Sequence, residues 1–288
     1  MSTTSERRPK PKDIPGQQLA YPASQADMTP APDSDLSNYK AAGKLTGKVA
    51  IITGGDSGIG RAVAIAYAME GANTAILYNA NDDDATKTKE IVEERGGQCL
   101  PIKMDVRKPE ECEDAVKQTV EKFGQLDILI NNAAFQMVRE DISELTIKQF
   151  HETFETNIFG YFHMFKAAYP YLKEGDVIIN TGSIIGKQGK GFLVDYSSSK
   201  GAVHTFTKSL ALNLAEKKIR VNAVVPGPVW TPNIPATMPE DEVDGFDSAN
   251  AMKRTGQPEE LAPAYVFLAA EDSSFMTGAL IDVTGGQL

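Results

Sequence analysis

Short apolar runs alternate with longer amphipathic segments from residue 45 to the carboxyl end of the chain. The short runs are continuous stretches of Val, Ile, Leu and Ala, a pattern typical of strands in a sheet. Strands are expected at 48–53, 73–79, 98–104, 126–131, 175–181, 219–225 and 278–283.

The longer segments repeat apolar residues every three or four positions, which predicts helices. Alternating strands and helices predict an α/β fold, with a doubly wound parallel sheet of about seven strands and helices on both faces. In such sheets ligands bind at the carboxyl ends of the strands. Helices are expected at 58–70, 82–95, 109–123, 144–172, 195–216 and 258–270.

The glycine-rich run GGDSGIG at 54–60 joins the first expected strand to the first expected helix. Glycine permits a tight bend and a close backbone approach, and the helix amino terminus attracts pyrophosphate, as in dinucleotide sites. The spacing differs from Gly-x-Gly-x-x-Gly, and no Gly-Lys-Ser/Thr ending follows, so a nucleoside-triphosphate loop is not expected. The residues expected at the pyrophosphate are Gly54, Asp56, Ser57, Gly58, Ile59 and Gly60.

Tyr196 and Lys200 stand four positions apart in an expected helix, with Ser183 upstream. Residues at i and i+4 share a helix face, so the ammonium is expected beside the phenol. A neighbouring cation lowers the pKa of a tyrosine from its usual ~10 and suits it to proton transfer. With Ser183 as a second hydroxyl, these residues predict a proton-transfer site. The alternative is a chance pair of surface residues, since Tyr-x-x-x-Lys is common on helices.

Further motifs follow the glycine turn: NNAA at 131–134, Ser183, Tyr196 with Lys200, and RVNAVVPG at 220–227. In this order they resemble the short-chain dehydrogenase/reductase family over residues 45–288, including its glucose/ribitol-dehydrogenase-like members with an amino-terminal extension. The resemblance implies a Rossmann domain, a nicotinamide cofactor and a homotetramer. It implies a catalytic set of Asn157, Ser183, Tyr196 and Lys200, in which Asn157 supports a water that links the lysine to solvent.

The resemblance also implies the rest of the cofactor site. Asp105 and Val106 resemble the family's adenine contact, with a helix or turn cap as the equal alternative for the aspartate. Lys200 is expected to bind ribose, and Trp230 only to pack the lid. The remaining contacts are expected beneath the nucleoside, at Asn131 and Ala133, and at the nicotinamide amide, at Pro226, Gly227, Val229 and Thr231.

The end of the second expected strand bears on the choice between NAD and NADP. Asn79 stands there, no Arg or Lys occurs from 72 to 86, and aspartates follow at 82–84. A 2′-phosphate would lack a cation and meet like charge, so NAD(H) is favoured and NADP(H) is the alternative. The aspartates can also be interpreted as a solvated helix start stabilised by the helix dipole.

Composition narrows the partners. The 288 residues are 41% hydrophobic, enough for a large core, and carry a formal charge of -10, which disfavours nucleic acid and anionic membrane surfaces. No apolar run approaches the ~20 residues that span a bilayer, and no secretion signal is evident, so a cytoplasmic address is expected. Cys99, Cys112 and the 3 histidines lack metal-ligand spacing, so no metal site is expected.

Residues 1–44 form a proline-rich extension before a single catalytic domain at 45–288. One interpretation is a disordered leader, because no helix or strand period appears there. The other is an ordered arm that lies on a neighbouring subunit. Its expected apolar anchors are Ile14, Leu19, Tyr21, Met28, Leu36 and Tyr39.

The function expected from these residues is hydride transfer between NAD(P)(H) and a small alcohol or carbonyl compound such as a sugar, polyol, aldehyde or ketone. Gln136 and Gln188 are candidates to recognise hydroxyls. The alternatives are a reductase of 3-oxoacyl thioesters, a catalytically silent nucleotide-binding protein and a sugar-nucleotide epimerase. Acidic residues in the expected lid, which would repel an acidic carrier protein, disfavour the first of these. They are Glu240, Asp241, Glu242, Asp244 and Asp247.

Overall fold

A parallel seven-stranded sheet forms the centre of the protein, with strand order β3-β2-β1-β4-β5-β6-β7. The computed structural model describes residues 8–246 and 250–287. The order reverses direction between β1 and β4, so the crevice of a doubly wound sheet opens there. The strands are β1 (Val49–Thr53), β2 (Asn73–Tyr78), β3 (Cys99–Lys103), β4 (Ile128–Asn131), β5 (Val177–Thr181), β6 (Arg220–Pro226) and β7 (Leu280–Val283).

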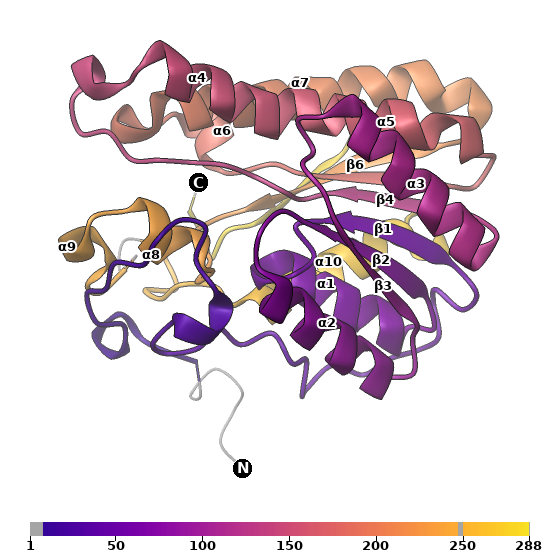
Figure 1. Ribbon diagram of the computed structural model, residues 1–288, viewed down its shortest axis with the longest axis horizontal. Helices are drawn as coiled ribbons and strands as arrows, with labels where there is room; N and C mark the ends of the chain where they lie inside the picture. Colours follow the sequence, from indigo (N-terminus) through magenta and orange to yellow (C-terminus); the bar gives the residue numbers. More distant parts are fainter. Residues whose placement is uncertain (1–7, 247–249, 288) are drawn as a thin grey trace.

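Helices cover both faces of this sheet, which confirms the predicted fold class. Figure 1 shows α1 (Gly58–Met69), α2 (Asp82–Glu94) and α10 (Pro258–Ala269) below it, and α3 (Pro109–Phe123), α5 (Gly160–Ala168) and α7 (Val194–Leu214) above it. Each helix described is too short or too polar to cross a membrane. The other α-helices described are α4 (Ile147–Phe154), α6 (Ile185–Gln188), α8 (Asn233–Thr237) and α9 (Glu240–Val243).

The prediction of one continuous helix at 144–172 is wrong, because the segment is interrupted. A π-helical turn, η5 (Glu155–Phe159), separates α4 from α5, and a 3-10 turn, η6 (Tyr169–Tyr171), ends the segment. The wide turn carries Asn157, whose side chain accepts from the backbone N–H of Phe135 at 2.8 Å and donates to its carbonyl at 2.9 Å. Such π-turns inside helices are frequent at functional sites, and no apolar period reveals them.

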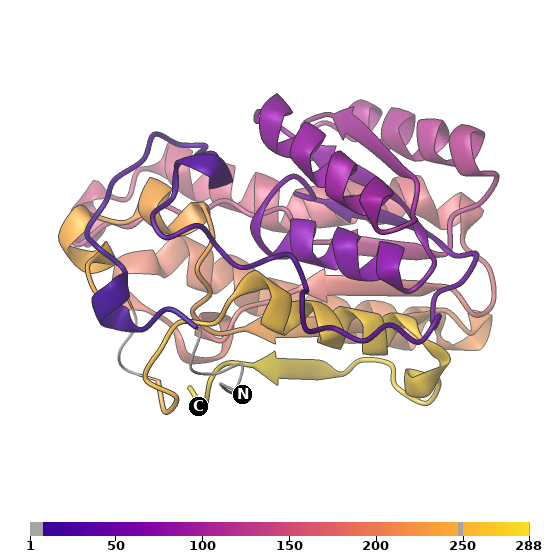
Figure 2. The same cartoon turned by 90° about the horizontal axis from the view of Figure 1, so that it is seen from below.

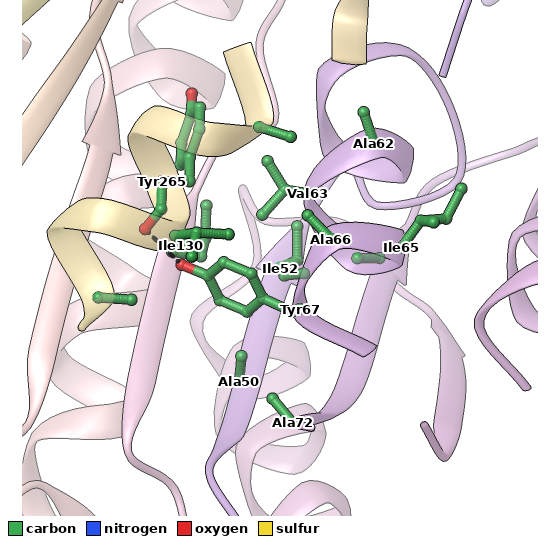
Figure 3. Packing of buried hydrophobic residues seen from close by; sticks show 14 of the residues in the cluster. Ala50, Ile52, Ala62, Val63, Ile65, Ala66, Tyr67, Ala72, Ile130 and Tyr265 are labelled. Atoms are coloured by element: carbon green, nitrogen blue, oxygen red, sulfur yellow. Dashed lines mark hydrogen bonds between the residues drawn. The ribbon is translucent and has the colours of Figure 1, made fainter. Parts of the chain in front are cut away.

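Small residues bring α1 close to β1. Ala62 and Ala66 are fully buried against the sheet, so the glycine turn and the helix that follows it form one rigid unit. Tyr67 fills the space toward α10 and donates its hydroxyl to the carbonyl of Tyr265 at 3.1 Å (Figure 3).

The described part of the amino-terminal extension, residues 8–44, lies on the body of its own chain. Ile14 and Met28 are 1% and 4% exposed and join the cluster around Trp230 and Met238. Figures 1 and 2 show this segment running beside α8 and α9. Apolar side chains of the extension thus find partners within the chain, and its contact with a neighbouring subunit stays a prediction.

A buried ion pair fixes the glycine turn against α2. The Arg61 guanidinium donates to Asp84 Oδ1 at 2.9 Å and to the carbonyl of Asp56 at 2.8 Å. Both charged side chains are almost fully enclosed, with 7% and 4% of their surfaces exposed. An enclosed ion with no partner is costly, so each charge holds the other in place.

Asp84→Ala should therefore lower the free energy of unfolding by about 3 kcal/mol, because it leaves the Arg61 charge buried without its partner. Urea unfolding followed by circular dichroism measures the change. Asp83→Ala, at the exposed neighbouring position, is the matched control and should shift the free energy by less than about 0.5 kcal/mol. Equal effects of the two substitutions would contradict the role assigned to the pair.

Candidate active site

A cavity of about 600 Å³ opens at the carboxyl ends of the strands. It runs from the glycine turn past the ends of β2 and β3 to the start of α7. Its size suits a dinucleotide together with a small substrate. Most of the predicted cofactor residues line it: Gly54, Asp56, Ser57, Gly58, Ile59, Asn79, Asp105, Val106, Ala133, Pro226, Gly227, Val229 and Thr231.

Gly60, Asn131 and Asn157 were expected at the site but do not line this cavity. A Cβ at Gly60 would lie 2.0 Å from the carbonyl oxygen of Gly54, so Gly60 lets the turn fold back on itself. Asn131 is buried in β4 and donates to Asn180 Oδ1 at 2.9 Å. At this strand end Asn132 reaches the wall, and its amide donates to the carbonyl of Thr53 at 3.0 Å.

Ser183, Tyr196 and Lys200 line the cavity together. The four-residue spacing places the ammonium on the tyrosine's side of α7, with Nζ 5.7 Å from the centroid of the ring. Nζ donates to the carbonyl of Thr181 at 2.7 Å and to the Tyr161 hydroxyl at 3.3 Å. The predicted pairing of the tyrosine and lysine is thus present, and the end of β5 orients the lysine.

Burial dominates the acid–base properties of this pair. It raises the pKa of Tyr196 to about 12, while a hydrogen bond with the Ser183 side chain lowers that pKa. It also lowers the pKa of Lys200 to about 7, so this ammonium is only partly charged at neutral pH. The net shift of the tyrosine pKa is upward, because loss of water outweighs the bond from Ser183, and the effect of Lys200 on that pKa stays a prediction.

Asp195 fixes the start of α7. Its carboxylate accepts from Thr153 Oγ1 at 2.6 Å and from Gln149 Nε2 at 3.1 Å, so it fastens α7 to α4. One turn further, Ser199 accepts from Asn157 Nδ2 at 2.9 Å. These bonds fix the direction of Tyr196, and the sequence motifs did not single out Asp195.

His204, on α7, contacts the backbone of Ser183 in the loop after β5. Its Nε2 accepts from the backbone N–H of Ser183 at 3.3 Å. Burial, and next the charge of Lys200, lower the pKa of His204 to about 4, so the ring is neutral at pH 7 and able to accept. The sequence suggested only a scattered histidine, because the contact comes from packing α7 against the loop after β5.

The substrate half of the cavity is mainly apolar. Gln136 lines it, although its amide already donates to Thr237 Oγ1 at 3.0 Å. Gln188, the other expected polar contact, is not among the lining residues. Asp247 of the expected acidic lid lies outside the described residues. The apolar lining includes Phe135, Ile184, Ile185, Phe192, Leu193, Ile234, Met238 and Phe246.

A lysine lies near the end of β2, where residues 72–86 carry no Arg or Lys. Lys103, at the end of β3, donates to Asp82 Oδ2 at 2.7 Å, and Tyr78 donates to Asp82 Oδ1 at 2.9 Å. Lys103 lies outside residues 72–86, and only the parallel pairing of β2 with β3 brings it beside Tyr78. This corner is therefore mixed in charge rather than purely acidic.

Comparison with known proteins agrees with this geometry. The family model described as Enoyl-(Acyl carrier protein) reductase matches residues 54–287. The chain is 52% identical over 273 residues to Uncharacterized oxidoreductase YhdF of Bacillus subtilis, covering 95% of this chain and 94% of that one. The chain belongs to the short-chain dehydrogenase/reductase family.

Other members of the short-chain dehydrogenase/reductase family are similar over nearly the whole chain. NADPH-dependent aldehyde reductase 1, chloroplastic, of Arabidopsis thaliana is 45% identical, covering 93% of this chain and 96% of that one. Glucose and ribitol dehydrogenase of Daucus carota is 42% identical, covering 95% and 96%. A short-chain dehydrogenase from Burkholderia cenocepacia J2315, solved in complex with NADP, superposes with a TM-score of 0.79 at 31% identity, covering 84% and 98%.

These findings confirm the predicted resemblance, including its glucose/ribitol-dehydrogenase-like members. The chain is an NAD(P)-dependent oxidoreductase of the short-chain dehydrogenase/reductase family that acts on CH–OH groups. The wall of its cavity also includes Tyr21, Pro22 and Ala23 from the amino-terminal extension, which the family motifs did not indicate.

The lowered pKa of Lys200, about 7 against 10.5 for an ordinary lysine, predicts a pH-dependent stability. Between these values the unfolded chain holds a proton that the folded chain has released, so stability rises with pH across this window. Lys200→Met removes the buried charge. Its melting temperature without nucleotide should exceed that of the unmodified protein at pH 7, and the difference should shrink as the pH approaches 10.5.

Differential scanning fluorimetry across this range measures the effect. Lys208→Met, at an exposed position of the same helix, is the control and should show no such trend. A difference for Lys200→Met that does not change with pH would show that the ammonium is not destabilised by burial.

Proposed function

We propose that this protein transfers a hydride reversibly between a nicotinamide cofactor and a small alcohol or carbonyl substrate, with Tyr196 as the proton donor and acceptor. The observation that carries the proposal is the convergence of Ser183, Tyr196 and Lys200 on the cavity that the glycine turn also lines. A bound nicotinamide supplies or accepts the hydride. The chain's own residues bind the cofactor and substrate, orient them and move the proton.

Ser183 and Tyr196 are proposed to hold the substrate oxygen between two hydroxyls. Their hydrogen bond lowers the pKa of the tyrosine against the opposing effect of burial. A hydroxyl pair polarises a carbonyl, after which the phenol delivers the proton in the direction of reduction. Lys200 is proposed to stabilise the phenolate and to bind ribose, from the position that Thr181 gives it.

Asn157 is proposed as the fourth member of the catalytic set, in the role that the family resemblance implies. In this chain its side chain joins η5 to the backbone of Phe135 and to Ser199. The side chain thus organises the turn, while the proposed proton route to solvent would use a water near Lys200.

The residues around the cavity fit a dinucleotide. The glycine turn offers backbone N–H groups at a helix amino terminus, which suits a pyrophosphate. Asp105 and Val106 are proposed at the adenine, Asn79 at its ribose, and the loop at 226–231 at the nicotinamide. Gly60 and Asn131 are proposed to support this site from behind, through turn closure and the bond to Asn180.

NAD(H) is the proposed preference, with NADP(H) as the alternative. Asn79 brings no charge, and Asp82 and Asp83 are exposed near it. Two findings favour the alternative: Lys103 is within reach of this corner, and two relatives are named with NADPH or NADP. A 2′-phosphate would have to draw Lys103 away from Asp82. For this reason NAD(H) is proposed as the preferred cofactor.

The proposed substrate is a small aldehyde, ketone, sugar or polyol. The names of the Arabidopsis thaliana and Daucus carota relatives support this class. The description of the family model favours an acyl thioester as the second candidate. Exposed Glu240, Asp241 and Glu242 beside the cavity oppose an acidic carrier protein, so the small substrates come first.

We further propose residues 1–44 as an amino-terminal extension of one catalytic domain at 45–288, in a cytoplasmic homotetramer without nucleic-acid or membrane partners. The half-exposed rings of Phe159 and Phe162, 51% and 46% exposed on neighbouring turns, support burial between subunits.

Tyr196→Phe should reduce turnover by about 10² to 10⁴-fold while leaving nucleotide affinity nearly intact, because the ring stays and only the proton donor is removed. The measurement is nicotinamide absorbance with both cofactors against a panel of polyols, aldehydes, ketones and a 3-oxoacyl thioester. Tyr171→Phe, on an exposed turn outside the cavity wall, is the control. A Tyr196→Phe enzyme that keeps more than about a tenth of the rate would rule out this tyrosine as the acid.

Asn79→Arg should shift the ratio of kcat/KM toward NADP(H) by roughly tenfold or more, because a guanidinium pairs well with a 2′-phosphate. Thr86→Arg adds the same charge at an exposed position of α2 and should leave the ratio unchanged. An unmodified enzyme that already favours NADP(H) tenfold would overturn the proposed preference for NAD(H).

A further inference from the structure

The amino-terminal extension reaches the nucleotide pocket through residues 21–25. Tyr21, Pro22 and Ala23 line the same cavity as the glycine turn and the catalytic tyrosine. Gln25, two residues further on, is 6% exposed. None of these residues belongs to a motif by which the family was identified.

Gln25 bonds directly to the glycine turn. Its Oε1 accepts from the backbone N–H of Gly58 at 2.7 Å, at the first residue of α1. Its Nε2 donates to Ser34 Oγ at 3.1 Å, which fixes the orientation of the amide. The side chain therefore determines where the turn proposed to carry the pyrophosphate lies.

The backbone of Gln25 joins the ion pair that holds the same turn. Its N–H donates at 2.8 Å to Oδ2 of Asp84, whose other oxygen pairs with Arg61. Arg61 in turn donates to the carbonyl of Asp56. Gln25 is thus bonded directly to Gly58 and, through Asp84 and Arg61, to the carbonyl of Asp56 on the other side of the turn.

Tyr21 and Ala23 extend this wall toward the nucleoside. Asn81, just after the end of β2, donates to the carbonyl of Ala23 at 2.8 Å. Tyr21 meets Phe135 edge to face, with 5.4 Å between ring centroids and 87° between the rings. Tyr21 thus lines the cavity against Phe135, whose backbone bonds to Asn157.

The extension is bonded on the substrate side as well. Leu19 donates to the carbonyl of Pro235 at 2.9 Å, and Gly245 donates to that of Ile14 at 3.0 Å. Trp230 donates its indole N–H to the carbonyl of Pro30 at 2.7 Å. Figure 2 shows the extension beside the segment that carries α8 and α9. Residues 21–25 are therefore held by the glycine turn and the start of α2 on one side and by bonds of the flanking residues to the segment at 230–245 on the other.

We propose that residues 21–25 form part of the nucleotide-binding site. In this site Tyr21 contacts the nucleoside portion of the cofactor and Gln25 positions the glycine turn. The inference rests on the proposed use of a nicotinamide nucleotide by this cavity. An aromatic ring on a nucleoside adds affinity, and an amide that fixes a turn spares the nucleotide the cost of ordering it. The extension thus contributes to catalysis by raising cofactor affinity.

The test compares Tyr21→Ala and Gln25→Leu in the full chain. Each should raise the Kd for NAD(H) and NADP(H) by roughly 5- to 20-fold, the loss expected for one ring contact or one buried hydrogen bond. Titration calorimetry measures the Kd. In steady state the KM for the nucleotide should rise while kcat at saturating nucleotide stays within twofold, a separation that a general loss of structure would not produce.

Two matched substitutions serve as controls. Gln17→Leu removes the same side chain from the same extension, where it bonds to both backbone groups of Thr29 and to the carbonyl of Pro15 and lies away from the cavity wall. Tyr171→Ala removes a tyrosine that is 43% exposed, as Tyr21 is 44% exposed. Both controls should keep the Kd of the unmodified protein within twofold.

Hydrogen exchange of the unmodified protein tests the same inference without any substitution. Added NADH or NADPH should slow exchange in the peptide that contains residues 21–25. Unchanged exchange there, or Kd values of Tyr21→Ala and Gln25→Leu within twofold of the unmodified protein, overturns the inference but leaves the proposed function standing. An unmodified protein that binds neither nucleotide overturns both.

Discussion

The parallel register of the central sheet is the constraint on which the site depends. Pairing of β1 with β4 and of β4 with β5 brings the ends of these strands to one edge, so Thr53, Asn132 and Thr181 meet there. At that edge the Asn132 side chain donates to the carbonyl of Thr53 and accepts from Thr181 Oγ1. The glycine turn, the orientation of Lys200 and the position of Ser183 all follow from this common edge.

Burial both creates and limits the chemistry of the site. Packing of α7 against α4 through Asp195 encloses Tyr196 and Lys200 beside one another. The same enclosure shifts both pKa values away from those of the free side chains in water. The pKa of the phenol rises and that of the ammonium falls. The Ser183 side chain gives the phenol a compensating hydrogen bond, so this second hydroxyl favours ionisation of the tyrosine.

The amino-terminal extension contacts both the glycine turn and the hydrophobic cluster around Trp230. Gln25 bonds to the glycine turn, while Ile14 and Met28 bury their side chains against Trp230 and its neighbours. The segment at 230–246 thereby packs on the extension as well as on the rest of the chain. Tyr21, Pro22 and Ala23 of the extension line the same cavity as the glycine turn and Phe246.

The amino-acid sequence by itself determined the fold class, the strands and most helices, the glycine turn and the Tyr196–Lys200 pair, because these depend on local periodicity and on motifs of fixed spacing. Tertiary structure decided what depends on contacts between distant segments. These include the π-helical turn at Asn157, the bond from His204 to Ser183 and the placement of Lys103 beside Asp82. The extension belongs to the same group, since its irregular backbone has no period and its position follows from partners distant in the sequence, such as Gly58 and Trp230.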